Sequence, residues 1–156
     1  MKFAKSLLNS IGLRLLLAFK AFSSPVAFGA IAIVDDAHGR VLLVRHSYQK
    51  GWHLPGGGVE AGEPPDEAIL RELKEDIGLI RSKPPEFAGL YTRRVGWVTN
   101  VIALYKVREA EIAFKPNYEI REILYADPAA PPPGTTRGTR RRLAELVGEA
   151  AQARYW

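Results

Sequence analysis

Three acidic side chains lie close together in a segment that the sequence predicts to be helical. Glu72, Glu75 and Asp76 stand at positions i, i+3 and i+4, so their carboxylates project from one side of a helix. Three like charges repel one another unless a cation binds them, and oxygen ligands suit Mg²⁺ or Mn²⁺. The chain contains no cysteine, which excludes thiolate ligands. The spacing therefore indicates a divalent metal site built from oxygen.

The alternative is that this charged run forms only the solvated face of an amphipathic helix, which is the commoner role of such runs. Ile69, Leu73 and Ile77 recur every four residues and predict a separate, buried face. The prolines in residues 64–66 and Gly78 predict where this helix begins and ends. For the helix alone, the solvated-face interpretation is favoured. The residues before the helix favour the metal site instead.

The segment before the helix is rich in glycine and contains a partner for the helix. Arg71 lies eight residues after Glu63 and four before Glu75, so it can tie a loop carboxylate to the helix. Gly57 and Gly58 allow the backbone to approach a ligand closely. We therefore predict that both glycines contact the substrate.

Loop and helix together resemble the Nudix box of the Nudix hydrolase family. After Gly57 come five residues, then Glu63, then seven residues, then the run from Arg71 to Leu79. Every position of fixed spacing in this 23-residue pattern is met, with one departure: Asp76 stands where the family usually has glutamate. The aspartate keeps the charge but retracts it by one methylene group.

The resemblance implies a reaction and its ligands. Water attacks one phosphorus of a diphosphate and releases a nucleoside monophosphate, and divalent metal ions position that water and lower its pKa. The metal ligands would be Glu72, Glu75, Asp76 and the backbone carbonyl of Gly57. We expect Mg²⁺ or Mn²⁺ as the cofactor.

Two further catalytic roles follow from the resemblance. Arg71 would orient the loop through Glu63. A general base is also required, and the open possibilities are Glu72 or Glu75 in the box and Glu119 and Glu122 in a later segment. For the last two, an exposed position on a surface strand is the commoner outcome.

Outside the box the substrate contacts are predicted from residue type. Trp52 can stack on a nucleobase, although a core position is commoner for tryptophan. Arg45 and Arg93 can grip phosphate or be ordinary surface residues. His46 and His53 flank the site in sequence, where structural roles are commoner than ligand roles.

Basic residues are concentrated at the ends of the chain. The net charge is +5, yet residues 25–133 hold thirteen basic and fifteen acidic side chains. We therefore expect a small-molecule nucleotide substrate and no specific nucleic acid. The arginines near the C-terminus are interpreted as solvating a helix end: Arg137, Arg140, Arg141 and Arg142.

The first 24 residues are predicted to form an amphipathic helix that precedes a Nudix domain over residues 25–156. An apolar stripe along this helix is formed by Leu7, Leu8, Ile11, Leu15 and Phe19. We expect the stripe to pack on the domain or on a second subunit in a homodimer. The alternative is a basic helix on an anionic membrane surface. Arg14 and Lys20 interrupt a secretory pattern, so we expect a cytoplasmic protein.

The remaining pattern predicts an α/β or α+β fold. We expect two paired strands over residues 26–36 and 41–44, further strands over 86–92, 98–107 and 119–125, and a final helix over 136–150. With the resemblance, this implies a mixed β-sheet sandwiched between α-helices.

The substrate is left open between a nucleoside triphosphate, which we slightly prefer, and a nucleotide sugar. The rival function is a catalytically silent module of this fold that senses a nucleotide or docks a partner. Intact box carboxylates count against that rival.

Overall fold

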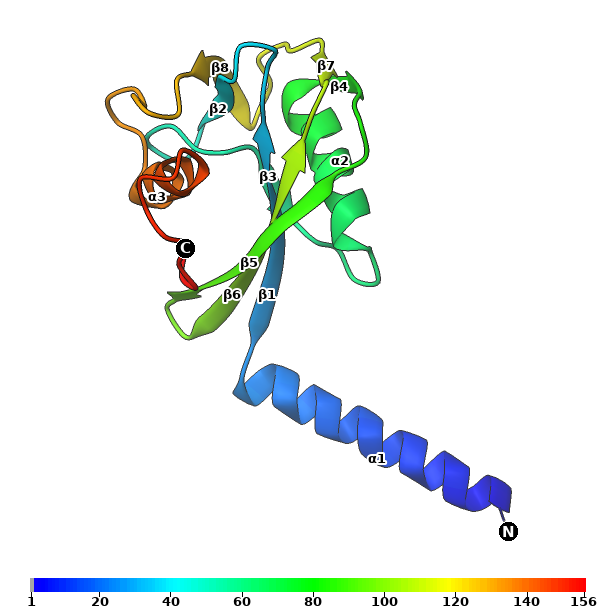
Figure 1. Cartoon of the computed structure of the whole chain (residues 1–156). Coiled ribbons are helices and arrows are strands. Elements are labelled where there is room, and N and C mark those ends of the chain that lie inside the picture. The colour runs from blue at the N-terminus through cyan, green and yellow to red at the C-terminus, as the bar shows by residue number, and fades with distance from the viewer. Residues whose placement is uncertain (1) are drawn as a thin grey trace.

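The central sheet of the computed structural model contains four strands in the order β3-β1-β6-β5 (Figure 1). The structure describes residues 2–156, with side chains from residue 13 onward. Strand β1 runs parallel to β6 and antiparallel to β3, and β5 and β6 form an antiparallel hairpin, so the sheet is mixed. The strands are β1 (Val26–Val34), β2 (Val41–His46), β3 (Gly56–Gly58), β4 (Leu79–Arg81), β5 (Glu86–Val95), β6 (Val98–Val107), β7 (Glu111–Ile112) and β8 (Ile120–Ala126).

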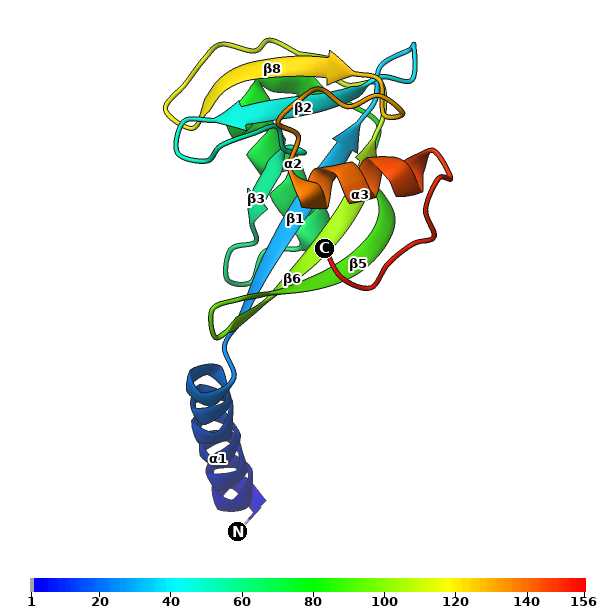
Figure 2. The ribbon, with the colours of Figure 1, turned by 90° about the vertical axis from the view of Figure 1, so that its left-hand side faces the viewer.

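Helices cover both faces of this sheet (Figure 2). On one face, α2 (Pro65–Ile77) buries Ile69, Leu73 and Ile77 completely. On the other, α3 (Arg137–Leu146) buries Leu143 against a second apolar cluster. The predicted sandwich is therefore confirmed.

The limits of α2 follow from local chemistry. Pro65 opens the helix with a fixed φ and no amide hydrogen to leave unpaired. Gly78 ends it in the left-handed conformation with φ of 68°, and its amide meets the carbonyls of Leu73 and Lys74. The predicted start and stop of the helix are confirmed.

The predicted pairing of the first two long strands is wrong. Strand β2 pairs antiparallel with β8, and only an isolated bridge between Asp35 and Val41 joins it to the end of β1. Both edges of β1 are instead occupied, by β3 and β6. Because each strand edge accepts one neighbour, the chain after residue 36 leaves the central sheet.

The C-terminal region also differs from the prediction. The final helix ends at Leu146, and the chain then turns at Gly148 and runs back to β5, where the Trp156 amide donates to the Thr92 carbonyl. Arg142 does not solvate the helix end. Its side chain is fully buried, its Nη2 atom lies 2.6 Å from the Glu145 carboxylate, and its guanidinium lies 3.9 Å from the centre of the Tyr91 ring.

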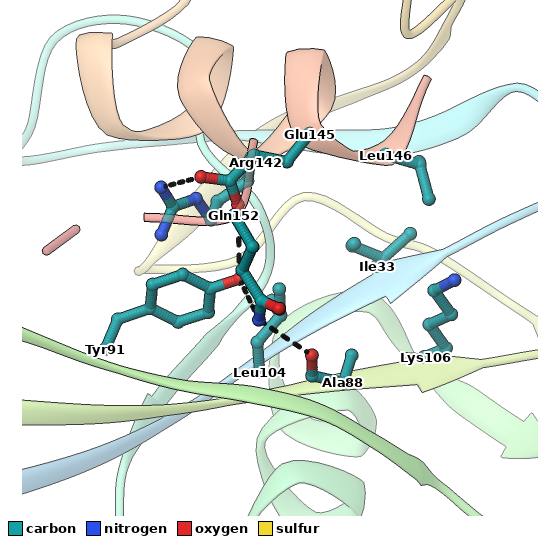
Figure 3. Close-up of a pocket in the computed structure, with 9 residues that line it drawn as sticks. All are labelled: Ile33, Ala88, Tyr91, Leu104, Lys106, Arg142, Glu145, Leu146 and Gln152. Carbon is teal, nitrogen blue, oxygen red and sulfur yellow. Dashed lines mark hydrogen bonds and ion pairs between the residues drawn. The ribbon is translucent and has the colours of Figure 1, made fainter. Parts of the chain in front are cut away.

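Arg142 and Glu145 line a cavity of about 170 Å³ between α3 and the sheet (Figure 3). Gln152 from the C-terminal segment donates hydrogen bonds to the Tyr91 hydroxyl and to the Ala88 carbonyl there. These contacts fasten the segment after α3 to strand β5. None of the box carboxylates lines this cavity.

Helix α1 (Lys2–Ser23) is confirmed as a helix, but its described side chains do not pack on the domain. Leu15 and Phe19 are each 67% exposed, and the helix projects from the end of the sheet where β1 begins (Figure 1). Packing on the domain is therefore not observed for the described part of the stripe. Leu7, Leu8 and Ile11 lie outside the residues whose side chains are described. No helix in the described part of the chain is long and apolar enough to cross a membrane.

Arg71 closes the loop between β3 and α2. Its Nε and Nη2 atoms donate to the two carboxylate oxygens of Glu63 at 2.8 and 3.0 Å, and Nη2 also donates to the Gly58 carbonyl at 2.9 Å. The Glu63 carboxylate accepts a further bond from the Glu60 amide. The bidentate pair therefore fixes both ends of the loop to the helix.

We expect the stability contribution of Glu63 to depend on pH. The hydrogen bond from Arg71 is the main cause that lowers the pKa of Glu63 from 4.5 to about 2. A lowered pKa in the folded state stabilises the protein above pH 4.5, and this stabilisation is lost as the pH falls towards 2. Thermal unfolding of Glu63→Gln should therefore show the largest loss of melting temperature near neutral pH. The loss should shrink in acid. Glu60→Gln, an exposed change of the same charge, is the control, and a pH-independent loss for Glu63→Gln would contradict the assignment.

Candidate active site

The glycine strand β3 brings the box loop against α2. Gly57 pairs with Ala30 of β1, and a side chain at position 57 would collide with the carboxylate of Glu72. A side chain at Gly29 would similarly press on the carbonyl oxygen of Gly57. Glycine at both positions therefore lets backbone oxygen and the helix carboxylate lie close together.

The three helix carboxylates have different surroundings. Arg71 Nη1 donates to Glu72 at 2.8 Å and to Glu75 at 3.4 Å. Glu75 is 62% exposed at its side chain, whereas Asp76 is buried with 4% exposure. Burial first, and then the charges of Glu72 and Glu119, raises the pKa of Asp76 to about 7.

These residues fit a hard divalent cation by the chemistry of their donors. Among the described residues, no three acidic or histidine side chains are already arranged around a common metal position, and Arg71 holds Glu72 and Glu75 in ion pairs. The raised pKa values of Glu72 and Asp76 are caused in part by neighbouring carboxylates. A bound cation offsets such repulsion, and oxygen donors suit Mg²⁺ or Mn²⁺.

The structure separates the two later glutamates. Glu119 lies between β7 and β8, in a loop that Asn117 fastens to the end of α2, and its charge contributes to the raised pKa of both Glu72 and Asp76. Glu122 lies on β8 and pairs with Arg45 at 3.0 Å. Of the two, Glu119 is therefore the one whose loop is fastened to the end of the box helix.

Asn117 positions Glu119. Its side-chain amide donates to the carbonyls of Glu75 and Asp76 at 3.3 and 3.1 Å, and its Oδ1 atom accepts from the amides of Glu119 and Ile120. The Ser47 amide donates to the Glu119 carbonyl at 2.8 Å. The loop before β8 is thus fastened to the end of α2.

A cavity of about 210 Å³ opens beside Gly57. Its wall combines hydrogen-bonding, cationic and aromatic side chains, among them Tyr48, His53, Arg93, Asn100 and Trp156. The charges of Glu119, Asp76 and Glu72 raise the pKa of Tyr48, after the larger effect of burial, so the tyrosine lies near the carboxylates. The cavity therefore has both a phosphate-compatible cation and aromatic surfaces.

The two histidines of this wall have pKa values below that of free histidine. Burial is the main cause that lowers the pKa of His46 and of His53, and Arg93 lowers the latter further. His46 Nδ1 is buried, and none of the described residues hydrogen-bonds with it. A neutral imidazole can donate or accept a hydrogen bond to a polar ligand.

Of the other predicted substrate contacts, Arg93 lies at this cavity, and Trp52 and Arg45 do not. Arg93 lines the cavity, and Gly58 is exposed with its carbonyl bound by Arg71. Trp52 lies in the core with 4% exposure, and the Arg45 guanidinium lies 4.3 Å from its ring centre. Trp52 and Arg45 therefore contact each other, and both line a neighbouring groove.

Sequence reasoning missed several residues of the site, among them Gly29, Tyr48, Asn100, Asn117 and Trp156. Tyr48 stands in a loop and Trp156 in the terminal segment, where no periodicity predicts a position. Asn117 alone carried a signal, because an asparagine followed two residues later by a candidate base is suited to an Asx turn.

Comparisons with known proteins identify the family of the chain. The family model described as a NUDIX domain matches residues 24–146. RNA pyrophosphohydrolase of Hahella chejuensis is 38% identical over 66 residues, which are 42% of this chain and 38% of that protein. The enzyme of the same name from Halorhodospira halophila is 51% identical over 51 residues, or 33% of this chain and 27% of that protein. The chain thus matches only about a third of the length of these curated relatives.

Solved structures confirm the fold. The crystal structure of MutT NUDIX hydrolase from Burkholderia pseudomallei superposes with a TM-score of 0.68 at 21% sequence identity, covering 78% of this chain and 98% of that one. The domain match, the fold and the box geometry lead to one conclusion. The chain belongs to the Nudix hydrolase family.

Proposed function

We propose that this protein is a metal-dependent pyrophosphohydrolase that cleaves the diphosphate of a nucleoside diphosphate linked to another group. The observation that carries the proposal is the Glu72 carboxylate lying against the backbone of Gly57, with Glu75 and Asp76 on the same helix. Gly57 also lines a cavity whose wall contains Arg93. Negative charge for a metal and positive charge for phosphate therefore stand next to each other.

Each residue has a role in this proposal. Glu72, Glu75, Asp76 and the Gly57 carbonyl would hold Mg²⁺ or Mn²⁺, which neutralises the diphosphate and lowers the pKa of water. Arg71 holds the loop through Glu63 and through the carbonyl of Gly58, the neighbour of Gly57. Glu119, on the loop that Asn117 fastens to the end of α2, would accept the proton of the attacking water.

The substrate chemistry we favour is a 5′-triphosphate, either of a free nucleotide or at an RNA end. The names of the curated relatives support the RNA form, although they match over only part of their length. Next to the cavity, a groove is lined by Arg45, Lys50 and Arg121 and shares Tyr48 with it. Cations and an exposed aromatic ring suit a nucleotide strand, which sequence analysis did not expect as a partner.

A hydrolysis screen separates the possible substrates from the rival silent module. Free nucleoside triphosphates, nucleotide sugars and 5′-triphosphorylated RNA are each incubated with folded protein and Mg²⁺. We expect release of pyrophosphate or phosphate from at least one triphosphate substrate. Absence of hydrolysis of all three classes, with nucleotide binding retained, would instead support the silent module.

Glu75→Gln should reduce turnover on the order of 10²-fold or more, because a negative charge of the metal site is lost while shape is kept. The melting temperature of metal-free protein should not fall, since one of several crowded like charges is removed. Glu86→Gln is a matched control, because Glu86 is also exposed and its arginine partner lies 3.5 Å away. Equal turnover in Glu75→Gln and wild type would remove the helix from the mechanism.

Glu119→Gln and Glu122→Gln form a second matched pair. We expect Glu119→Gln to lower kcat by about 10²- to 10⁴-fold, the usual contribution of a general base. Glu122→Gln should leave kcat nearly unchanged, because only an exposed ion pair with Arg45 is lost. Steady-state kinetics with saturating Mg²⁺ measures both. A comparable loss in the two variants would contradict the assignment of the base.

Activity should require an added divalent ion. Excess chelator should abolish hydrolysis, and Mg²⁺ or Mn²⁺ should restore it, because the acidic cluster offers only oxygen ligands. Hydrolysis that persists unchanged in chelator would show that the carboxylates serve another purpose.

A further inference from the structure

Helix α1 exposes apolar side chains that nothing in the described part of the chain covers. Leu13, Leu15, Leu16, Leu17, Phe19 and Phe22 are each between 55% and 80% exposed. Side chains of this size in water represent an unfavourable state unless a partner covers them. A partner surface for α1 is therefore required.

A second exposed apolar group lies at the same end of the molecule. The hairpin tip between β5 and β6 exposes Val95 by 53% and Trp97 by 68%, and Val26 at the start of β1 is 62% exposed. The Thr99 amide donates to the Pro25 carbonyl at 3.1 Å, and Val26 is in register with Thr99. The end of α1 and the hairpin tip are thus joined, as both views show (Figures 1 and 2).

The charges of these two segments have one sign. Residues 1–34 contain four basic residues, Lys2, Lys5, Arg14 and Lys20, and no acidic residue. Residues 87–105 also contain no acidic residue, and Arg94 donates to the Gly96 carbonyl at the hairpin tip. The apolar surface is therefore accompanied by positive charge alone.

We propose that α1 and the β5–β6 hairpin tip bind the surface of an anionic lipid bilayer. A basic helix with large leucine and phenylalanine side chains lies in the interface between headgroups and acyl chains. A tryptophan with one apolar and one polar edge is suited to the same depth. Anionic headgroups supply the complementary charge for the arginines and lysines.

A second copy of the chain is a less suitable partner. Two such surfaces would bring together positive charges without a compensating acidic residue in either segment, and like charges repel. Self-association is therefore the contrary outcome of the test. The bilayer proposal is independent of the proposed hydrolysis, because neither α1 nor Trp97 contributes to the carboxylate cluster.

Co-sedimentation of the full-length protein with vesicles tests this proposal. One set of vesicles contains phosphatidylcholine alone, and the other contains equal parts of phosphatidylcholine and phosphatidylglycerol. We expect binding to the anionic vesicles that is at least tenfold stronger and that weakens as salt is raised. Equal binding to both sets, or binding to neither, would overturn the proposal.

Three variants divide the surface into its parts. Arg14→Gln with Lys20→Gln should weaken binding to anionic vesicles on the order of tenfold or more, and Leu15→Ser with Phe19→Ser should weaken it at least as much. Trp97→Ser should give a smaller loss at the hairpin tip. The control is Arg81→Gln with Lys83→Gln, which removes two exposed charges from β4 and the following loop, at the opposite end of the molecule (Figure 1).

The melting temperature of every variant shows whether the domain remains folded. Sedimentation equilibrium without vesicles measures self-association. A dimer that Leu15→Ser with Phe19→Ser dissociates, together with no preference for anionic vesicles, would assign α1 to a second copy of the chain. Binding that the control reduces as strongly as the α1 variants would also overturn the proposal.

Discussion

Five hydrogen bonds from Arg71 connect the loop, the strand and the helix on which the site is built. They reach Glu63 twice, Glu72, Glu75 and the Gly58 carbonyl. A planar guanidinium can satisfy this set because its five donors point in fixed directions, which a lysine ammonium cannot reproduce. Its position therefore determines where the Gly57 backbone lies relative to the helix carboxylates.

The same network balances a concentration of negative charge. Asp76 is buried close to Glu72 and Glu119, and both neighbours raise its pKa. One arginine is shared by three glutamates, so it pairs with more carboxylates than its single charge balances. An arrangement of this kind costs stability in the absence of a ligand, and the surrounding packing of α2 on the sheet has to offset that cost. Functional sites often contain ionisable groups whose pKa values are perturbed in this way.

Regular periodicity made the larger part of the fold predictable. The spacing of Ile69, Leu73 and Ile77, with proline before and glycine after, specified α2 because a helix needs one apolar face and defined ends. Three glycines give no alternation of apolar and polar side chains, so strand β3 could not be recognised. The partner strand of β2 also could not be predicted from local sequence, because strand pairing depends on which edges remain free after the whole sheet forms.

The candidate site was predictable only where its residues lie close together in sequence, on one helix. Glu72, Glu75 and Asp76 share one helix, so their proximity followed from helical geometry alone. Glu119 and Glu122 are three residues apart and differ in sequence context very little, yet the Asn117 turn directs one to the cluster and Arg45 pairs with the other. Glu119 and Glu122 can be distinguished only from the contact between the loop before β8 and the end of α2. These two segments are more than forty residues apart in sequence.

The parallel pairing of β1 with β6 has a consequence for how the chain is made. Strand β1 (Val26–Val34) cannot pair with β6 (Val98–Val107) until β6 has left the ribosome, because more than sixty residues separate the two strands. During this interval β1 lacks one edge partner, and the acidic helix has been synthesised without the sheet that buries its apolar face. Parallel contacts of such sequence separation form slowly, since the loop entropy is lost before the contacts stabilise the chain. Nascent chains of this protein would therefore expose a β-branched strand edge of the kind that chaperones protect from aggregation.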